Sequence, residues 1–395
     1  MTRVGVVGLG YVGLTLAVTL AKKGFTVFGV DRVPRVVEAL DAVVLCVSTP
    51  VDPATRAPNL EGLRTAARAV AATCALHTLV IVRSTVPIGA SRGVVLPELV
   101  GSWGGARLAF CPERTIQGQA LRELEQLPQV VGGLDEASAA AAEALFARVT
   151  PRVVRVSSLE AAEMVKLVNN CHTDLIYSFG NELALLAERA HLDPLEVIRA
   201  ANLDYPRPDL SKPGYVGGGC LSKDPYILLA SGQALGHEPW LVGRARALNE
   251  YLPGHVARRF LTLLAEARGG LDGARVALLG FAYKGWPPTD DMRGAPVVPM
   301  LDVLRTAPVT AVGHDFLVAP QIIRELGVEP RPLEQVFDGI DGVLVITDHP
   351  EYAKLDLGMA LGRLRRPAVV YDSWRILDEA AVRAAGVRYA GIGYA

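Results

Sequence analysis

The chain has few cysteines, histidines and aromatic residues, no long apolar run and no excess of either charge. Its 395 residues include five cysteines and seven histidines, without a C-x-x-C pair or the cysteine–histidine spacing of a metal site. Forty basic residues balance forty-one acidic ones, which argues against a surface for nucleic acid or membrane. We therefore expect a reduced, cytoplasmic protein without a metal, whose partners are small molecules.

The N-terminus shows no targeting segment. Met1-Thr2-Arg3 leads directly into a short apolar strand and a glycine turn, a pattern typical of neither a signal peptide nor a membrane span. Half of the 395 residues are hydrophobic, so the chain is long enough for two or three domains, each with its own core.

The first part of the chain alternates short apolar strands with helices, which predicts a parallel α/β sheet. Strands are expected over 4–7, 26–30, 42–47, 79–82, 108–111 and 129–131, and a helix over 14–23. Gly8-Leu9-Gly10-Tyr11-Val12-Gly13 joins the first strand to that helix, and Asp31 ends the second strand. Because such glycines admit a pyrophosphate to a helix N-terminus and Asp31 can bind a ribose, the pattern predicts an NAD-binding Rossmann domain over 1–155.

Asp31 also favours NAD over NADP, since its carboxylate repels a 2′-phosphate. Only Arg32 to Leu40 separate the second strand from the third, whereas a parallel crossover usually needs about a dozen residues or more. Either this crossover is minimal or residues are absent near 39–41. Further along, Thr49 and Thr85 follow two strand ends, where they would contact cofactor or substrate or serve only as turn residues.

The middle of the chain is predicted to be helical over 156–262. Ser157-Ser158-Leu159-Glu160 is typical of a capping box, and Asp193-Pro194-Leu195-Glu196 begins another helix in the same way. After the first of these, apolar residues recur at helical spacing at Met164, Leu167, Cys171, Leu175, Phe179, Leu183 and Leu186. We expect one long helix here, carrying a dimer interface.

From Arg275 the opening pattern recurs, which predicts a second Rossmann-like domain over 263–395. Residues 275–280 echo residues 3–8, but no further glycines follow Gly280, so this domain is not expected to bind a dinucleotide in the usual way. The expected fold class is α/β, with two Rossmann-like, doubly wound parallel sheets joined by a long central helix. The cleft between the two domains is the expected active site.

Cys220 follows three glycines and precedes a predicted helix start. The glycines let backbone N–H groups approach a substrate, while Asp224 as N-cap and Pro225 as first helical residue bring the positive end of a helix near the sulfur. With Lys223 alongside, this arrangement should lower the thiol pKa, which predicts a nucleophilic cysteine. A buried structural cysteine is the alternative.

Glu163, Lys166 and Asn170 fall at i, i+3 and i+7 and so share one face of the long helix. From this spacing alone, a solvated charged face is the favoured interpretation. Asp224 taken alone is most simply a helix cap, and His172 is the only histidine next to a candidate site.

Together the motifs resemble those of the UDP-glucose/GDP-mannose dehydrogenase family over nearly the whole chain. The matching segments are 8–13, Val47-Ser48-Thr49-Pro50, Ser84-Thr85-Val86-Pro87, Cys111-Pro112-Glu113-Arg114, Lys166-Leu167-Val168-Asn169-Asn170, 217–224 and Asp290-Asp291-Met292-Arg293. Segments 112–118, 181–184 and 224–226 are most similar to the branch acting on UDP-N-acetylhexosamines, chiefly UDP-N-acetylmannosamine or UDP-N-acetylglucosamine. The UDP-glucose branch usually has Pro-Glu-Phe in place of Pro-Glu-Arg.

The resemblance implies roles for individual residues. Cys220 would be the nucleophile, surrounded by the other expected catalytic residues, Lys166, Asn170, Asp224, Thr85 and Glu113. NAD would be held by Gly8, Gly10, Tyr11, Val12, Gly13, Asp31, Thr49, Thr85 and Arg293. The nucleotide sugar would be bound by Arg114, Thr115, Lys166, Asn170, Arg207, Gly217, Gly218, Tyr283, Lys284 and Arg375. Of these, Arg207 would come from the other subunit of a homodimer.

The implied activity is a four-electron oxidation of the sugar C6 to a uronic acid for surface polysaccharide, through a cysteine thiohemiacetal and thioester. UDP-glucose or GDP-mannose are alternative substrates. Relatives often have a basic residue where Val36 stands, an arginine where Thr173 stands, and some forty more residues before the third strand. A two-electron hydroxyacid dehydrogenase and a nucleotide-sugar binding protein without turnover are the alternative functions.

Overall fold

The computed structural model describes residues 2–31, 40–205 and 209–395. The chain divides into two compact units, the first formed by Met1–Cys171 with Lys223–Pro239 and the second by His172–Ser222 with Trp240–Ala395. Each unit has its own sheet and its own hydrophobic cores. The expectations for Val36, Arg207 and the short crossover lie outside the described residues.

The first unit contains a seven-stranded sheet in the order β2-β1-β3-β4-β5-β6-β7. The strands are β1 (Arg3–Val7), β2 (Thr26–Val30), β3 (Ala42–Leu45), β4 (Leu79–Val82), β5 (Arg107–Phe110), β6 (Gln129–Gly133) and β7 (Val153–Arg155). Every strand predicted from the sequence is present. Neighbours are parallel except β5 and β6, which are antiparallel.

The sheet is therefore parallel as predicted except at the β5–β6 pair. After β5 the chain forms only the short helix α4 (Ala120–Gln126) and then starts β6, without first crossing back to the opposite edge. The start of β6 consequently lies at the edge where β5 ends, the edge at which doubly wound sheets bind ligands.

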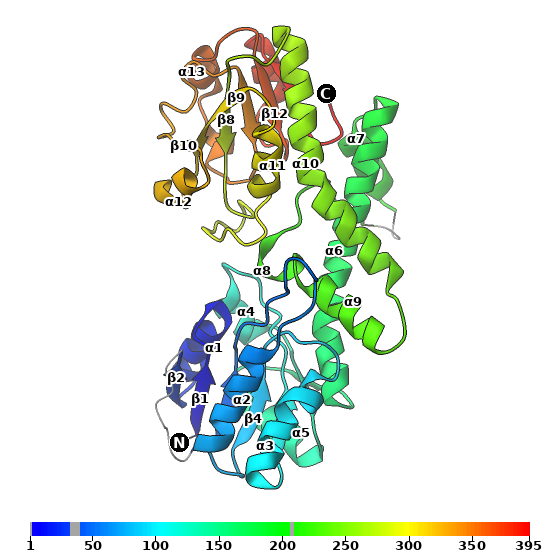
Figure 1. The fold of residues 1–395 in the computed structure, drawn as a ribbon, viewed down its shortest axis with the longest axis vertical. Helices are drawn as coiled ribbons and strands as arrows, with labels where there is room; N and C mark the ends of the chain where they lie inside the picture. Colours follow the sequence, from blue (N-terminus) through cyan, green and yellow to red (C-terminus); the bar gives the residue numbers. More distant parts are fainter. Residues whose placement is uncertain (1, 32–39, 206–208) are drawn as a thin grey trace. The chain divides into compact units, whose positions relative to one another are not determined.

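Helices cover both faces of this sheet, as a parallel arrangement requires. They are α1 (Tyr11–Lys22), α2 (Glu61–Thr73), the π-helical turn η1 (Ser91–Val95), α3 (Leu96–Trp103) and α5 (Glu136–Phe146) (Figure 1). Helix α9 (Asp224–Ala234) also belongs to this unit. Successive side chains of β3 point to opposite faces: Val44 packs with α1 and α5, and Val43 with α2 and α3. Each of these valines is no more than 1% exposed.

The second unit contains a wholly parallel six-stranded sheet in the order β10-β9-β8-β11-β12-β13. Its strands are β8 (Ala274–Leu279), β9 (Val309–His314), β10 (Glu329–Pro330), β11 (Gly342–Val345), β12 (Val369–Asp372) and β13 (Arg388–Ala390). Its shorter helices are α7 (Pro194–Asn202), α8 (Gly218–Leu221), α11 (Val297–Leu304), α12 (Pro320–Glu325), η2 (Tyr352–Lys354), α13 (Leu357–Gly362) and α14 (Glu379–Ala384). The predicted second Rossmann-like sheet is confirmed.

Two long helices complete the chain. The predicted long helix is confirmed as α6 (Leu159–Ala190), which begins in the first unit and ends in the second, while α10 (Trp240–Arg268) packs beside α11 (Figure 1). Ser158 caps α6 by accepting a hydrogen bond from the Ala161 N–H. Asp193 caps α7 as expected. None of the described helices is long and apolar enough to cross a membrane.

Candidate functional site

The three glycines of the β1–α1 turn have three different surroundings. Gly8 has φ +89°, and a Cβ there would lie 2.7 Å from the Cys46 carbonyl oxygen. A Cβ on Gly13 would overlap the Gly8 carbonyl, so Gly13 allows close packing of helix on strand. Among residues 2–31, 40–205 and 209–395, no atom lies within 4 Å of the Gly10 Cβ position, which leaves room there for a ligand. This division of roles is what a dinucleotide pyrophosphate requires.

The N-terminus of α1 suits an anion. Gly10 is its N-cap and offers no side-chain hydrogen bond, and the first turn carries no acidic residue, so the positive end of the helix dipole is not neutralised locally. Asp31 approaches the same turn, where its Oδ2 accepts a hydrogen bond of 3.0 Å from the Leu9 N–H. These features fit NAD, with phosphates on the turn and Asp31 facing the ribose.

The Thr85 loop, residues 84–91 between β4 and η1, is anchored from several directions. The Thr49 hydroxyl donates to the Thr85 carbonyl at 2.6 Å, and the Ser231 hydroxyl of α9 accepts from the Ile88 N–H. Glu163 of α6, which is fully buried, accepts hydrogen bonds from the Gly89 and Ser91 N–H groups. Burial raises the pKa of Glu163 against the effect of these hydrogen bonds.

Lys166, Asn170 and Asp224 come together within the first unit. Asn170 donates from Nδ2 to Asp224 Oδ2 at 2.5 Å, and Lys223 Nζ donates to Asp224 Oδ1 at 2.9 Å. Asp224 is fully buried, and Lys166, one turn before Asn170 on α6, is 8% exposed. No hydrogen bond or ion pair of the Lys166 ammonium is found among residues 2–31, 40–205 and 209–395. Its donors are therefore available to a ligand.

Two sequence expectations are wrong here. The face of α6 that carries Glu163 and Lys166 is buried rather than solvated, whereas Met164 and Phe179 of the apolar stripe are about half exposed (48% and 52%). In addition, Asp224 is the first residue of α9 and Lys223 its N-cap, and the Lys223 side chain does not cap the helix. The Asp224 carboxylate binds Asn170 and Lys223 instead of capping the helix.

Glu113 lies in a buried network at the carboxyl ends of β4 and β5. Arg83 donates to its Oε2 from Nε (3.1 Å) and Nη2 (2.6 Å), and the Thr115 N–H donates to its Oε1 at 2.7 Å. Burial raises the pKa of Glu113, but the Arg83 charge and these hydrogen bonds outweigh it and leave the pKa below its usual 4.5. Glu113 is thus an ionised acceptor that receives hydrogen bonds from Arg83 and Thr115.

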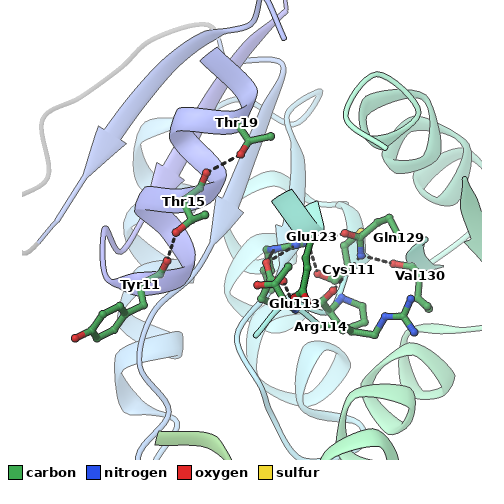
Figure 2. A network of polar contacts seen from close by, with 12 residues as sticks. Tyr11, Thr15, Thr19, Cys111, Glu113, Arg114, Glu123, Gln129 and Val130 are labelled. Carbon is green, nitrogen blue, oxygen red and sulfur yellow. Dashed lines mark hydrogen bonds and ion pairs between the residues drawn. The ribbon is translucent and has the colours of Figure 1, made fainter. Parts of the chain in front are cut away.

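Gln129, at the start of the antiparallel strand β6, completes this network. Arg83 Nη1 donates to Gln129 Oε1 at 2.9 Å and to the Cys111 carbonyl at 3.0 Å. Gln129 Nε2 in turn donates to the Val130 carbonyl (Figure 2). Arg114, an expected substrate ligand on the same loop, donates from Nη2 to the Pro128 carbonyl. Its Nε–H is buried and has no hydrogen-bond partner in the part of the chain that the structure describes.

Arg83 belongs to this network but was not among the residues predicted from the sequence. The residue precedes Ser84-Thr85 directly, and its partner Glu113 lies thirty residues away, so only the pairing of β4 with β5 reveals the contact. An arginine within a buried apolar strand end was the one available signal, since buried charges are normally paired.

We expect Arg83→Met to lower the free energy of unfolding by about 3–5 kcal/mol, because it leaves the Glu113 carboxylate buried and unpaired. The double variant Arg83→Met/Glu113→Gln should lose less than the sum of the single variants, as urea unfolding would measure. The folded-state pKa of Glu113 is lowered, so its contribution is present above pH 4.5 and is lost as pH falls through the folded pKa. A Glu113→Gln deficit that persists unchanged at lower pH would contradict this pairing.

In the second unit, the three glycines before Cys220 accommodate protein atoms. A Cβ on Gly217 would overlap the Gly294 carbonyl, one on Gly218 (φ +86°) would lie 2.7 Å from the Tyr283 ring, and one on Gly219 would lie 2.6 Å from Arg293 Cζ. The glycines were expected to admit a substrate. They also let segment 283–294 pack against the cysteine loop, and Cys220 itself is exposed within the one-turn helix α8.

The remaining expected ligands of this unit form two groups. Beside the cysteine loop, the Lys284 ammonium lies 5.4 Å from the centre of the Tyr283 ring, and Arg293, whose side chain is 58% exposed, pairs with Asp291. Arg375 belongs to a second group, where its guanidinium binds Asp193 at 2.6 Å and Glu379 at 3.2 Å. Arg375 has φ +53°, an uncommon conformation for a residue with a Cβ.

The other cysteines are poor candidates for a nucleophile. Burial raises the pKa of Cys46 and of Cys111 to about 12, and it also raises the pKa of Cys74. Cys171 is buried. Cys220 is the single exposed cysteine, and all five lie in the described part of the chain. In that same part, no group of three histidine, cysteine or acidic residues is arranged to hold a metal ion.

The doubly wound sheet with its glycine turn and open helix N-terminus defines a dinucleotide-binding protein of the dehydrogenase type. Comparison with protein families matches residues 2–42 and 32–150 to the NAD binding domain of the UDP-glucose/GDP-mannose dehydrogenase family, 160–251 to its central domain and 277–379 to its UDP binding domain.

Individual relatives match along the whole chain. The UDP-N-acetyl-D-mannosamine dehydrogenase of Pyrococcus horikoshii is 30% identical over 433 residues, covering 99% of each chain. A solved structure of the UDP-D-ManNAc dehydrogenase from that organism has a TM-score of 0.87 at 29% identity, covering 99% of each chain. A UDP-glucose dehydrogenase structure from Pyrobaculum islandicum has a TM-score of 0.84 at 29% identity, covering 100% of this chain and 98% of its own.

The chain belongs to the UDP-glucose/GDP-mannose dehydrogenase family and is an NAD-dependent nucleotide-sugar dehydrogenase. The predicted family, fold class and cofactor are confirmed.

Proposed function

We propose that the chain oxidises the C6 hydroxymethyl group of UDP-N-acetyl-D-mannosamine to the carboxylate, with UDP-N-acetylglucosamine as the alternative hexosamine. The observation that carries the four-electron scheme is the exposure of Cys220 on a glycine loop, while the other four cysteines are buried or half-buried. Such an oxidation needs a thiol that can reach a substrate carbon. The choice of sugar is supported by the name of the Pyrococcus horikoshii relative and by the Pro112-Glu113-Arg114 motif.

The proposed site has Lys166, Asn170 and Asp224 around the reacting carbon. Bound NAD would supply the hydride acceptor, two equivalents for each sugar. The C6 hydroxyl proton passes to the neutral amine form of Lys166, which becomes the ammonium, or to a water beside it. The Lys166 ammonium and the Asn170 amide then stabilise oxyanions at C6, a role supported by the burial of Lys166 and by its lack of a partner in the described segments.

In the proposed covalent steps, the Cys220 thiolate adds to the C6 aldehyde and forms a C–S bond, with the oxyanion taking up a proton. The resulting thiohemiacetal loses a second hydride and a proton and becomes a thioester. A water molecule oriented by Thr85, Glu113 or Asp224 attacks the thioester, releasing the carboxylate and returning the thiol. Glu113 suits the water because its lowered pKa keeps the carboxylate ionised, and an ionised carboxylate accepts hydrogen bonds from water.

The remaining sequence predictions complete the proposal. Residues 1–155 bind NAD, 156–262 carry the cysteine loop and a homodimer interface, and 263–395 bind the nucleotide. The nucleotide sugar is bound by Arg114, Thr115, Arg207, Gly217, Gly218, Tyr283, Lys284 and Arg375, with Arg207 donated by the second subunit, and Arg293 contacts NAD. The product serves surface polysaccharide synthesis in a reducing cytoplasm, in keeping with five free cysteines.

NADH formation tests the substrate. The purified chain with NAD should reduce about two NAD per sugar with UDP-N-acetylmannosamine and give a much lower kcat/KM with UDP-glucose and GDP-mannose. UDP-N-acetylglucosamine distinguishes the two hexosamines in the same assay. A highest kcat/KM with UDP-glucose, which the Pyrobaculum islandicum relative favours, would contradict the hexosamine assignment. NAD binding without reduction by any of the four sugars would contradict the enzymatic proposal itself.

A further inference from the structure

A buried polar cluster between α6 and α10 is hydrogen-bonded to the segment that carries Cys220. Its members are Asp174 and Asn181 of α6 and Arg246 and Asn249 of α10, each no more than 2% exposed. All four lie in the second unit, as does Cys220. Burying charged and amide groups is costly unless each finds partners, so the partners of this cluster indicate what it holds.

Arg246 binds both ends of the loop that contains the glycines and the cysteine. Its Nη2 donates to the Val216 carbonyl at 3.2 Å, immediately before Gly217, and its Nη1 donates to the Leu221 carbonyl at 2.9 Å, immediately after Cys220. Nη1 also donates to Asp174 Oδ1 at 2.6 Å. One guanidinium therefore joins α6 to the residues on either side of the loop.

The amides of the cluster hold the same segment further upstream. Asn181 makes two hydrogen bonds with the backbone of Gly214, donating to its carbonyl at 3.0 Å and accepting from its N–H at 2.8 Å. Asn249 accepts from Asn181 at 2.8 Å and donates to Asp174 Oδ1 at 3.0 Å. The segment is thus fixed at three points, residues 214, 216 and 221.

We propose that Arg246 is a positioning residue for the thiol chemistry, setting the place of Cys220 by holding the carbonyls on both sides of its loop. The inference rests on the proposed role of Cys220 as nucleophile. The glycines allow the loop backbone many conformations, so contacts with the rest of the protein must select the one that is adopted. A planar guanidinium can bind two carbonyls and a carboxylate at once, whereas a lysine ammonium is a point charge without this fork.

A second ion pair between the same two helices provides a matched control. Arg259 of α10 pairs with Glu188 of α6 at 2.9 Å, thirteen residues beyond Arg246 and so roughly 20 Å further along the helix. Replacing either arginine by methionine removes an α6–α10 ion pair. Only the replacement of Arg246 also removes the hydrogen bonds to the Val216 and Leu221 carbonyls. When Arg246 is removed, the buried Asp174, whose pKa burial already raises, can take up a proton and become neutral.

The test compares full-length Arg246→Met, Arg246→Lys and Arg259→Met. For Arg246→Met we expect kcat to fall about 10²-fold, because displacement of a reacting group by about 1 Å has effects of that size. Iodoacetamide labelling of Cys220, followed by peptide mass spectrometry, should change in rate, and the Kd for NAD should stay within about twofold. Arg246→Lys should be intermediate. Arg259→Met should lose thermal stability but keep the wild-type kcat and labelling rate.

The proposal is overturned if Arg246→Met and Arg259→Met lose kcat equally, or if Arg246→Lys has wild-type kcat and labelling rate. If Arg246→Met fails to fold, the kcat and labelling rate of Arg246→Lys test the proposal. Cys220→Ser, measured in parallel, separates the covalent role of Cys220 from the positioning role of Arg246. If that variant keeps two NADH per sugar, the covalent scheme itself fails. If it loses them while both Arg246 variants behave as wild type, only the positioning role fails.

Discussion

Replacing Cys220 by serine should reduce the full four-electron turnover by at least about 10³-fold while leaving the first oxidation possible. A serine hydroxyl is ionised far less readily than a thiol at neutral pH, so the aldehyde has no covalent partner and the second hydride is not released. The expected product is aldehyde with at most one NADH per sugar. Measurement of NADH yield and mass spectrometry of the sugar product would detect both.

Cys74→Ser is the matched control for this substitution. Cys74 is half-buried at the end of α2, and burial raises its pKa, so its replacement should leave the NADH yield at two per sugar. Because the pKa of Cys46 and of Cys111 is raised to about 12, iodoacetamide at pH 8 should label Cys220 well before either of them. Two NADH per sugar from Cys220→Ser would end the covalent scheme.

The second large effect is expected in the glycine turn, where two similar substitutions should have different consequences. Gly10 has φ −69°, which alanine adopts without strain, and a Cβ there meets no atom of the described residues within 4 Å. The added methyl group would instead meet the pyrophosphate. Gly10→Ala should therefore raise the Kd for NAD by about 10²-fold and leave the Tm unchanged, as calorimetry would measure.

Gly13→Ala should instead destabilise the folded protein. Its methyl group overlaps the Gly8 carbonyl, so α1 must move away from β1, at a cost of about 3 kcal/mol in the free energy of unfolding. NAD affinity falls as a consequence. Equal loss of Tm in the two variants would mean that Gly10 has a structural rather than a ligand-facing role.

Local sequence patterns predicted most of the fold, because strands and helices are determined largely by residues that are close together in the sequence. Short β-branched runs mark buried strands, and thirty-two residues of helical periodicity mark α6. The glycine turn was predictable for the same reason, because the steric requirement for each glycine arises within a single β–α unit. The first-turn position of Asp224 differed from the prediction by one residue, which is the usual variation at a helix end.

What the sequence could not reveal was which faces are covered and which distant residues pair. Spacing placed Glu163, Lys166 and Asn170 on one side of α6 but gave no sign that the Thr85 loop and α9 bury that side. Arg246 and Asp174 are seventy-two residues apart, and the other hydrogen-bond partners of Arg246 are backbone carbonyls, which every residue type carries. The polar network around Cys220 therefore became visible only from the folded chain.

The reversed strand β6 has a consequence for how this enzyme tolerates change in length. Gln129 lies next to Arg83 because the chain enters β6 at the edge where β5 leaves the sheet. One extra residue inserted between Gln129 and Val130, with the rest of β6 kept in register, would turn the Gln129 side chain to the other face of the sheet. Arg83, which binds Glu113, would then lose a hydrogen-bond partner. An insertion after Gly133, past the far end of the strand, should be absorbed by the loop without reaching the carboxylate.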